Sequence, residues 1–183
     1  MTVGVGNIAK IMVGECPYRI WKDMRAPKEE ESPQLKRWIE RHEELVNFFV
    51  DEFKKENPDW FVVTDHSIEL DGITGRIDIL GRGKGNKFTI WEVKTGREYP
   101  YYPKQLELYV IIEQKRNPDA KIHGELRYVD HVPYNVADID CDEVWNEALR
   151  IRDMLENDKP PQRVECDGCR WCDYRSVLHC PSI

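Results

Sequence analysis

Apolar residues recur with two different periods along the chain, and the change of period separates predicted helices from predicted strands. From about residue 34 to residue 55 they fall at helical spacing, directly after Ser32 and Pro33, which are typical of a helix cap and a first-turn proline. His42 lies on the same face as the apolar residues that we expect to point inward, which are Leu35, Trp38, Ile39, Leu45, Val46, Phe49 and Phe53. The pattern therefore predicts a long amphipathic helix that covers one face of a sheet.

Strand-like runs follow this helix, with the sequences WFVVTDHSIEL, ITGRIDILG and KFTIWEVKT. The first two are joined at Asp71 and Gly72 and the last two by the glycine-rich RGKGN, so both connections are predicted to be hairpin turns. A second helix is expected from Pro103 to about Arg116, a fourth strand in AKIHGELRYVDHV, and a third helix over about residues 140–156. This order predicts an α/β fold built on a mixed sheet.

Length and composition fit one domain with its own hydrophobic core. The chain has 183 residues and a mass of 21.7 kDa. Lys10 interrupts the short apolar run at the N-terminus, so we expect no signal peptide, no membrane span and a cytoplasmic protein. The net charge is −7, from 27 basic and 34 acidic residues, and a nucleic-acid partner would therefore need a local basic groove.

Two carboxylates and a lysine are expected to meet on the second and third strands. Asp78 interrupts an apolar strand, and Glu92 and Lys94 stand two apart, so both point from one face. Hairpin pairing would bring Asp78 beside Glu92, and Mg²⁺ or Mn²⁺, bound also by the Val93 carbonyl, would offset the cost of burying both carboxylates. Lys94 would then orient or deprotonate the attacking water, or neutralise charge on a phosphate. This predicts a metal-dependent phosphodiesterase site; the alternative is a surface salt bridge between Glu92 and Lys94.

Two further side-chain positions bear on this site. His42 lies on the inward face of the helix that would cover the sheet, so it is placed to reach the metal; the alternative is a core histidine with ordinary hydrogen bonds. Gln105 and Tyr109 are four residues apart and share one face of the second helix.

Cysteine is clustered at the C-terminus, where Cys166, Cys169, Cys172 and Cys180 fall within fifteen residues. A reducing compartment favours a metal site over disulfides for such a cluster. One reading is a zinc site made by these four thiols alone, and another is a ferredoxin-like run in which Cys166, Cys169 and Cys172 are followed by the Cys-Pro of Cys180. A third includes the remote Cys16 near the N-terminus. The remaining thiol, at position 141, is expected to be buried or free.

The motifs GRIDIL, WEVKTG and PKQLELY resemble the successive motifs of the PD-(D/E)XK nucleases of the RecB branch, whose hallmark after the Glu-x-Lys strand is Gln-x-x-x-Tyr. With CPYRIW near the N-terminus and the cysteines at the other end, nearly the whole chain resembles the CRISPR-associated exonucleases called Cas-four, and more distantly the AddB-type nucleases. The resemblance implies a single domain over residues 1–183, with a restriction-endonuclease-like core in residues 30–160. Residues 1–29 and 161–183 together would form a small iron-sulfur module.

The resemblance also implies roles for individual residues. It assigns catalysis to His42, Asp78, Glu92 and Lys94, with Gln105 and Tyr109 supporting the site or holding DNA. It implies that the divalent cation is held by His42, Asp78, Glu92 and Val93. It implies an iron-sulfur cluster, 4Fe-4S rather than 2Fe-2S, held by Cys16, Cys169, Cys172 and Cys180, although the spacing to the last cysteine is longer than the family pattern.

The implied activity is metal-dependent cutting of single-stranded DNA or frayed ends, in the trimming and selection of new CRISPR spacers beside the integrase. The alternatives are a RecB-like repair or viral nuclease outside CRISPR and a non-catalytic DNA-binding assembly module. The cluster is expected to fix a basic and aromatic arch at the entrance to the active site, formed by Arg19, Trp21, Arg170 and Trp171; the alternative is that these four residues serve ordinary packing and surface charge.

Overall fold

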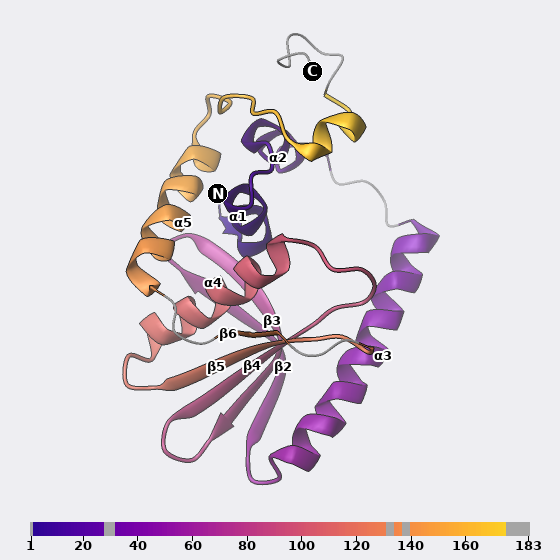
Figure 1. Ribbon diagram of the computed structural model, residues 1–183, viewed down its shortest axis with the longest axis vertical. Helices are drawn as coiled ribbons and strands as arrows, with labels where there is room; N and C mark the ends of the chain where they lie inside the picture. The colour runs from indigo at the N-terminus through magenta and orange to yellow at the C-terminus, as the bar shows by residue number, and fades with distance from the viewer. Residues whose placement is uncertain (1, 28–31, 131–133, 137–139, 175–183) are drawn as a thin grey trace.

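The computed structural model describes residues 2–27, 32–130, 134–136 and 140–174. Its elements, shown in Figure 1, are in chain order β1 (Val3–Gly4), α1 (Val5–Met12), α2 (Pro17–Asp23), α3 (Pro33–Glu56), β2 (Phe61–Leu70), β3 (Ile73–Gly83), β4 (Lys87–Val93), α4 (Tyr101–Arg116), β5 (Lys121–Arg127), β6 (Tyr134–Val136), α5 (Cys141–Glu156) and the short 3-10 helix η1 (Asp167–Trp171). The predicted helices and strands are all present. α4 begins two residues before Pro103, because proline is tolerated in a first helical turn.

Within the described part of the chain the strands form one six-stranded sheet, which is mixed as the sequence predicts, and β1 and β6 are additions to the four predicted strands. β3 pairs in antiparallel fashion with β2 and β4, while β4 and β5 run parallel and are joined through α4. The turn between β2 and β3 has positive φ angles at Asp71 (49°) and Gly72 (76°), the combination that closes a tight hairpin. These hairpins set the register between the strands that carry the predicted site.

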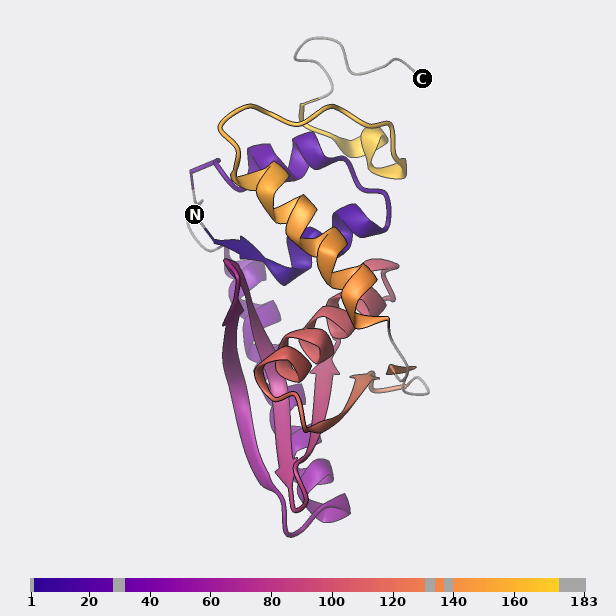
Figure 2. The same cartoon turned by 90° about the vertical axis from the view of Figure 1, so that its left-hand side faces the viewer.

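Helices cover both faces of the sheet, as Figure 2 shows. α3 packs on one face, where the buried residues are Val46, Phe49, Val50, Phe53, Ile79, Trp91 and Val93. A larger apolar core lies on the other face, beneath α1, α4 and α5, and includes Ile8, Ile90, Leu106, Ile111 and Trp145. The sheet is therefore the middle of three layers.

The prediction for the inward face of α3 is wrong in its first half. Leu35 is 44% exposed and Trp38 is 51% exposed, and the buried stretch begins only at Val46. The reason is geometric, because the first turns of α3 extend beyond the edge of the sheet (Figure 1), so that the apolar period continues where there is no sheet to cover it.

The N-terminal segment joins the sheet and the core. β1 pairs with β3 at Ile73 and Thr74, and α1 and α2 contribute Val5, Ile8 and Ile20 to the larger core. Trp21, expected in an arch over the active site, is instead buried, and its Nε1 donates a hydrogen bond to the Asn157 carbonyl at 2.8 Å. That expectation is therefore wrong for this tryptophan, which ties α2 to the end of α5.

None of the helices in the described residues combines the length and the apolar composition that a membrane crossing requires.

Candidate active site

The site lies where β3 has no strand partner on one of its edges. Along this edge β3 pairs with β1 at Ile73 and Thr74 and with β4 from Ile79 onward. Residues 75–78 therefore have no strand partner on this edge, which leaves a gap in the sheet. Tyr109 of α4 fills the gap, and a Cβ atom at Gly75 would come within 2.5 Å of its Cε1. Only glycine at position 75 admits the tyrosine ring at this distance.

Asp78 stands at the margin of this gap and is buried. Its Oδ2 accepts a hydrogen bond from the Val93 backbone N–H at 2.8 Å, and its Oδ1 lies 3.3 Å from Nε2 of His42 on α3. The hydrogen bond to Val93 crosses from β3 to β4 and brings Asp78 beside Glu92. His42 thus reaches the site from the helix on the opposite face of the sheet from α4.

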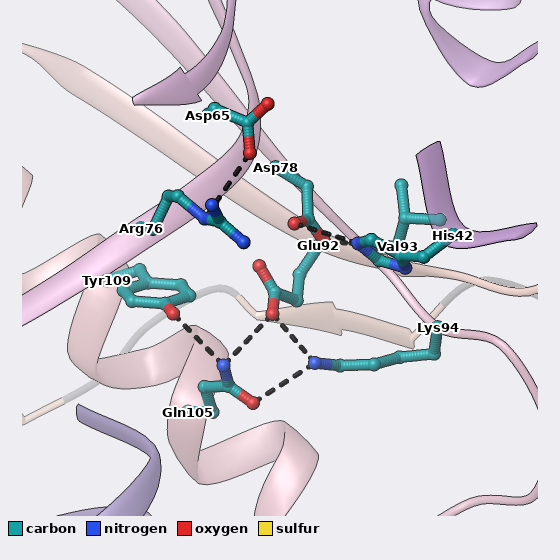
Figure 3. A network of polar contacts seen from close by, with 9 residues as sticks. All are labelled: His42, Asp65, Arg76, Asp78, Glu92, Val93, Lys94, Gln105 and Tyr109. Carbon is teal, nitrogen blue, oxygen red and sulfur yellow. Dashed lines mark hydrogen bonds and ion pairs between the residues drawn. The ribbon is translucent and has the colours of Figure 1, made fainter. Parts of the chain in front are cut away.

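Glu92 is 3% exposed and belongs to a network that connects β4 with α4, shown in Figure 3. Its Oε1 accepts hydrogen bonds from Lys94 Nζ at 2.7 Å and from Gln105 Nε2 at 3.0 Å. The Gln105 side chain also accepts from Lys94 Nζ, at 3.1 Å, and its Nε2 lies 3.0 Å from the Tyr109 hydroxyl. Each of the six side chains predicted for catalysis therefore lies in one continuous cluster.

The cluster is short of positive charge. Burial raises the pKa of Glu92 to about 7, and the negative charge of Asp78 adds to this, although Lys94 acts in the opposite direction. The second oxygen of Glu92, Oε2, is buried without a hydrogen-bond partner. The hydrogen bond to Asp78 raises the pKa of His42, although burial opposes it. A cation would satisfy the free carboxylate oxygen and offset the unfavourable charge.

The donors fit a hard divalent cation of the Mg²⁺ or Mn²⁺ type, because the free oxygen of Glu92 lies beside a second carboxylate. Among the residues that the structure describes, no group of three or more histidine, cysteine, aspartate or glutamate side chains is arranged to hold a metal by itself. Mg²⁺ does not require such a cage, since it usually keeps several waters and takes one or two carboxylates. Asp78 and Glu92 would supply these, and ligation by His42 and the Val93 carbonyl stays a prediction.

The pH dependence of metal binding follows from the raised pKa of Glu92. The folded protein holds this proton up to about pH 7, against about 4.5 for an ordinary glutamate, so the metal-free fold loses stability as the pH rises between these values. Mn²⁺ needs the ionised carboxylate and counteracts the loss. We expect Mn²⁺ to raise the melting temperature by about 3 °C or more at about pH 8 and by much less near pH 5.5, measured by differential scanning fluorimetry.

Glu92→Gln is the matched control, because it keeps the size of the side chain and removes its charge. It should abolish most of the shift produced by Mn²⁺ at both pH values. An equal shift in the variant would place the cation elsewhere.

The cluster lies at the base of a cleft of about 1120 Å³. Its walls carry aromatic and basic side chains, namely Trp38, Tyr99, Tyr101, Tyr102, Lys10, Arg76, Lys94 and Arg97. Of these residues only Lys94 was predicted from the sequence to be functional, although the tyrosine-rich EYPYYP after the Glu-x-Lys strand was a usable signal. Such walls suit a flexible polyanion with flat bases.

The aromatic walls are fixed by contacts with charged side chains of the site. The Trp38 indole stacks on the His42 ring, with centroids 5.4 Å apart and an angle of 9° between the planes. On the opposite wall, Lys94 Nζ lies 4.2 Å from the centre of the Tyr102 ring. The catalytic cluster and the walls therefore form one connected unit.

Arg76 reaches the same cleft from β3 and is positioned by an unusual residue of β2 (Figure 3). Asp65 has a φ of 51°, in the left-handed region that disfavours residues other than glycine, and its Oδ1 lies 3.3 Å from Arg76 Nε. Backbone strain of this kind is often retained at functional sites.

A second candidate site lies at the ends of the chain. Cys16, Cys166, Cys169 and Cys172 all line one small cavity between α2 and η1. The Val164 N–H donates to Cys16 Sγ at 3.5 Å, and Cys166 Sγ lies 3.9 Å from Cys169 Sγ. The predicted ligands Cys16, Cys169 and Cys172 are thus brought together, Cys166 joins them, and Cys180 lies outside the described residues.

At Cys166 this cavity favours the neutral thiol over the thiolate. Burial raises the pKa of the Cys166 thiol. The five cysteines in the described ranges are free thiols, and Cys141, at the start of α5, does not line this cavity.

Comparison with known proteins gives a family and a fold. The family model described as the PD-(D/E)XK nuclease superfamily matches residues 12–181. None of the curated proteins compared with the chain matches it.

Among solved structures, SSO0001 is similar over 99% of this chain and 86% of its own, with a TM-score of 0.55 and 19% identity. The alkaline exonuclease LHK-Exo from Laribacter hongkongensis is similar over 85% of this chain and 88% of its own, with a TM-score of 0.54 and 14% identity. Its complex with dAMP gives a TM-score of 0.55 at the same identity and coverage. At these identities the likeness concerns the fold.

Proposed function

The chain belongs to the PD-(D/E)XK nuclease superfamily, and from this membership and the geometry of its cleft we propose that it is a metal-dependent DNA exonuclease acting on single strands or frayed ends. One observation carries the proposal: Glu92 is a buried carboxylate with a free oxygen, beside Asp78 and 2.7 Å from the Lys94 ammonium. Two carboxylates and an ammonium at the base of an open cleft are the groups that phosphodiester hydrolysis needs.

The side chains of the site have different roles in the proposed reaction. A divalent cation held by Asp78 and Glu92 would polarise the scissile phosphate and lower the pKa of a bound water. Lys94 presents an ammonium to the negative charge that develops on the phosphate. Gln105 holds Lys94 and Glu92 at their present positions, and His42 does the same for Asp78.

Support for single strands comes from the walls of the cleft. Successive bases can stack on the tyrosine wall and on Trp38, while Lys10, Arg76 and Arg97 can pair with phosphates. The net charge of −7 argues against extended wrapping of duplex DNA. LHK-Exo, which shares the fold, is described as an alkaline exonuclease, and one of its structures contains dAMP.

The test is a degradation assay with end-labelled DNA. We expect cutting of single strands in the presence of Mn²⁺ or Mg²⁺, no cutting in the presence of a chelator, and slow attack on blunt duplex. Stepwise products from one end would identify an exonuclease. Failure to cut any DNA in either metal would contradict the proposal.

We also propose that the cysteine cavity holds an iron-sulfur cluster, of the 4Fe-4S type rather than 2Fe-2S. The support is that Cys16 lines the same cavity as Cys166, Cys169 and Cys172, whereas a zinc site of the tail cysteines alone gives no reason for it. The predicted fourth ligand, Cys180, competes with Cys166 for this role. A cluster ligated by Cys16 and the C-terminal cysteines would bridge the two ends of the chain.

The biological setting is proposed from the resemblance of the motifs to Cas-four nucleases, namely the processing of spacer precursors beside the CRISPR integrase. A RecB-like repair or viral nuclease would use the same chemistry, and a non-catalytic assembly module would not need the Asp78, Glu92 and Lys94 set. Co-purification with an integrase distinguishes the first setting from the others.

A further inference from the structure

A second hollow, of about 390 Å³, lies next to the catalytic cleft, between α3 and the segments that follow β4 and β5. We call it the α3 groove; it is lined by Trp38, Arg41, Glu44, Leu45, Phe48, Thr95, Gly96 and Val129. Its surface is unusually apolar for a position in contact with water, since Phe48 is 53% exposed and Val129 is 72% exposed. Neither the fold nor the proposed catalytic chemistry accounts for these exposed side chains.

The groove is continuous with the cleft. Trp38, Thr95 and Gly96 line both hollows. Trp38 also stacks on His42, whose Nε2 lies 3.3 Å from Asp78 Oδ1. The Trp38 indole and the His42 imidazole stacked on it therefore lie between the groove and Asp78, and a strand with a phosphate at the cluster has a neighbouring nucleotide within reach of the groove.

The exposed rings of the groove are held in place from below. Phe48 packs edge-on against the buried Phe49, with centroids 5.3 Å apart and an angle of 70° between the planes. Trp38 is fixed by its parallel stack on His42. Rings that are rigid before binding lose little conformational entropy when a flat partner stacks on them, so they are preorganised for aromatic ligands.

Charge at the rim indicates which aromatic ligand fits. Arg41 is placed to pair with a phosphate, and Glu44 beside it can accept a hydrogen bond from a ring N–H or an amino group of a base. Unpaired nucleotides combine a flat apolar ring, hydrogen-bonding edges and a phosphate, whereas the bases of a duplex are already stacked and paired.

We propose that the α3 groove binds one or more unpaired bases of the DNA strand whose phosphate lies at Asp78 and Glu92, with Phe48 and Trp38 as stacking surfaces. This inference rests on the proposed nuclease function and extends it, because it adds the α3 groove to the path of the strand. The proposed occupant of the groove is therefore nucleic acid and not a protein partner.

The test asks whether removing one base from the strand and removing the Phe48 ring from the protein affect the same binding contact. Binding of fluorescent oligothymidylate of roughly twelve nucleotides is measured by anisotropy in Ca²⁺, within the range of single-strand site sizes. A single abasic residue is moved along the strand. At the position over the groove it should weaken binding to the wild-type protein about tenfold, as expected for the loss of one stacked base.

In Phe48→Ala the intact strand should bind about tenfold more weakly, and the abasic residue at that position should cost less than about twofold more, because base and ring act as a pair. Phe61→Ala is the matched control, since Phe61 is 67% exposed on β2 and lines neither hollow. It should bind the intact strand as the wild-type protein does.

Two results would refute the proposed DNA site in the groove. One is full affinity of Phe48→Ala for the intact strand, and the other is that the abasic residue weakens binding to Phe48→Ala as much as it weakens binding to the wild-type protein. The groove would then be a candidate site for a protein partner. Hydrolysis of bis(4-nitrophenyl) phosphate by the wild-type protein with Mn²⁺ tests the chemistry separately, because this small diester cannot span to the groove. Hydrolysis of this diester together with a null result for Phe48 refutes the groove alone, whereas its absence together with failure to cut any DNA refutes the proposed nuclease.

Discussion

Replacing Glu92 with glutamine should lower the rate of single-strand cutting by about a thousandfold, which corresponds to roughly 4 kcal/mol of lost transition-state stabilisation. The side chain keeps its volume and can still contact Lys94 and Gln105, but it no longer carries the charge that holds the cation. Asp78→Asn should have an effect of the same order, because it weakens the cation site from the other side and alters the contacts with His42 and Val93. Rates are measured with labelled single-stranded DNA in Mn²⁺.

The matched control is Glu43→Gln, a carboxylate that lines the same cleft but is exposed. It should cut within about twofold of the wild-type rate, since surface substitutions of this kind change little. Circular dichroism should show all three variants folded. Wild-type rates in Glu92→Gln or Asp78→Asn would refute the assignment of the active site.

Cys16→Ser should abolish the bound iron and most of the soluble protein together. Cys16 is buried, accepts from the Val164 N–H and lines the cavity shared with the C-terminal cysteines, so its loss removes a ligand and a contact between the two chain ends. Ligand binding and folding are coupled in such small metal modules. Protein purified without oxygen should be brown, with absorbance near roughly 400 nm and iron confirmed by elemental analysis, and the variant should be colourless.

Two further variants identify the fourth ligand. If Cys180 is the ligand, Cys180→Ser loses iron and Cys166→Ser keeps it; if Cys166 is the ligand, the outcomes are reversed. Cys141→Ser serves as the control that keeps iron in either case, because Cys141 lies outside the cavity. Wild-type protein that is colourless and contains zinc but no iron, even without oxygen, would refute the cluster.

Much of the architecture was predictable because it depends on local signals. The helical period placed α3 to within about one residue, and turn residues such as Asp71 and Gly72 identified the hairpins. Register then follows from the hairpin, so the meeting of Asp78 with Glu92 could be expected before the structure. The spacing of Gln105 and Tyr109 likewise predicted that both act on one side of the site.

The rest depends on contacts between segments that carry no local signal. β1, α1 and α2 are too short for a periodic pattern to identify them. The apolar period of α3 cannot show where the sheet beneath it ends, and for that reason Trp38 was placed in the core although it lies in the cleft. The role of Gly75 is visible only when Tyr109 occupies the gap beside it.

The bond between the Val164 N–H and Cys16 Sγ joins residues that are 148 positions apart. Bringing two such distant points of a flexible chain together costs roughly 4 kcal/mol of entropy, before any gain from the contact itself. We therefore expect this contact to form late, once the sheet has shortened the path between the ends, and to open before the sheet does. A group ligated from both sides would act chiefly on the unfolded chain, because it converts an open polymer into a ring with far fewer conformations.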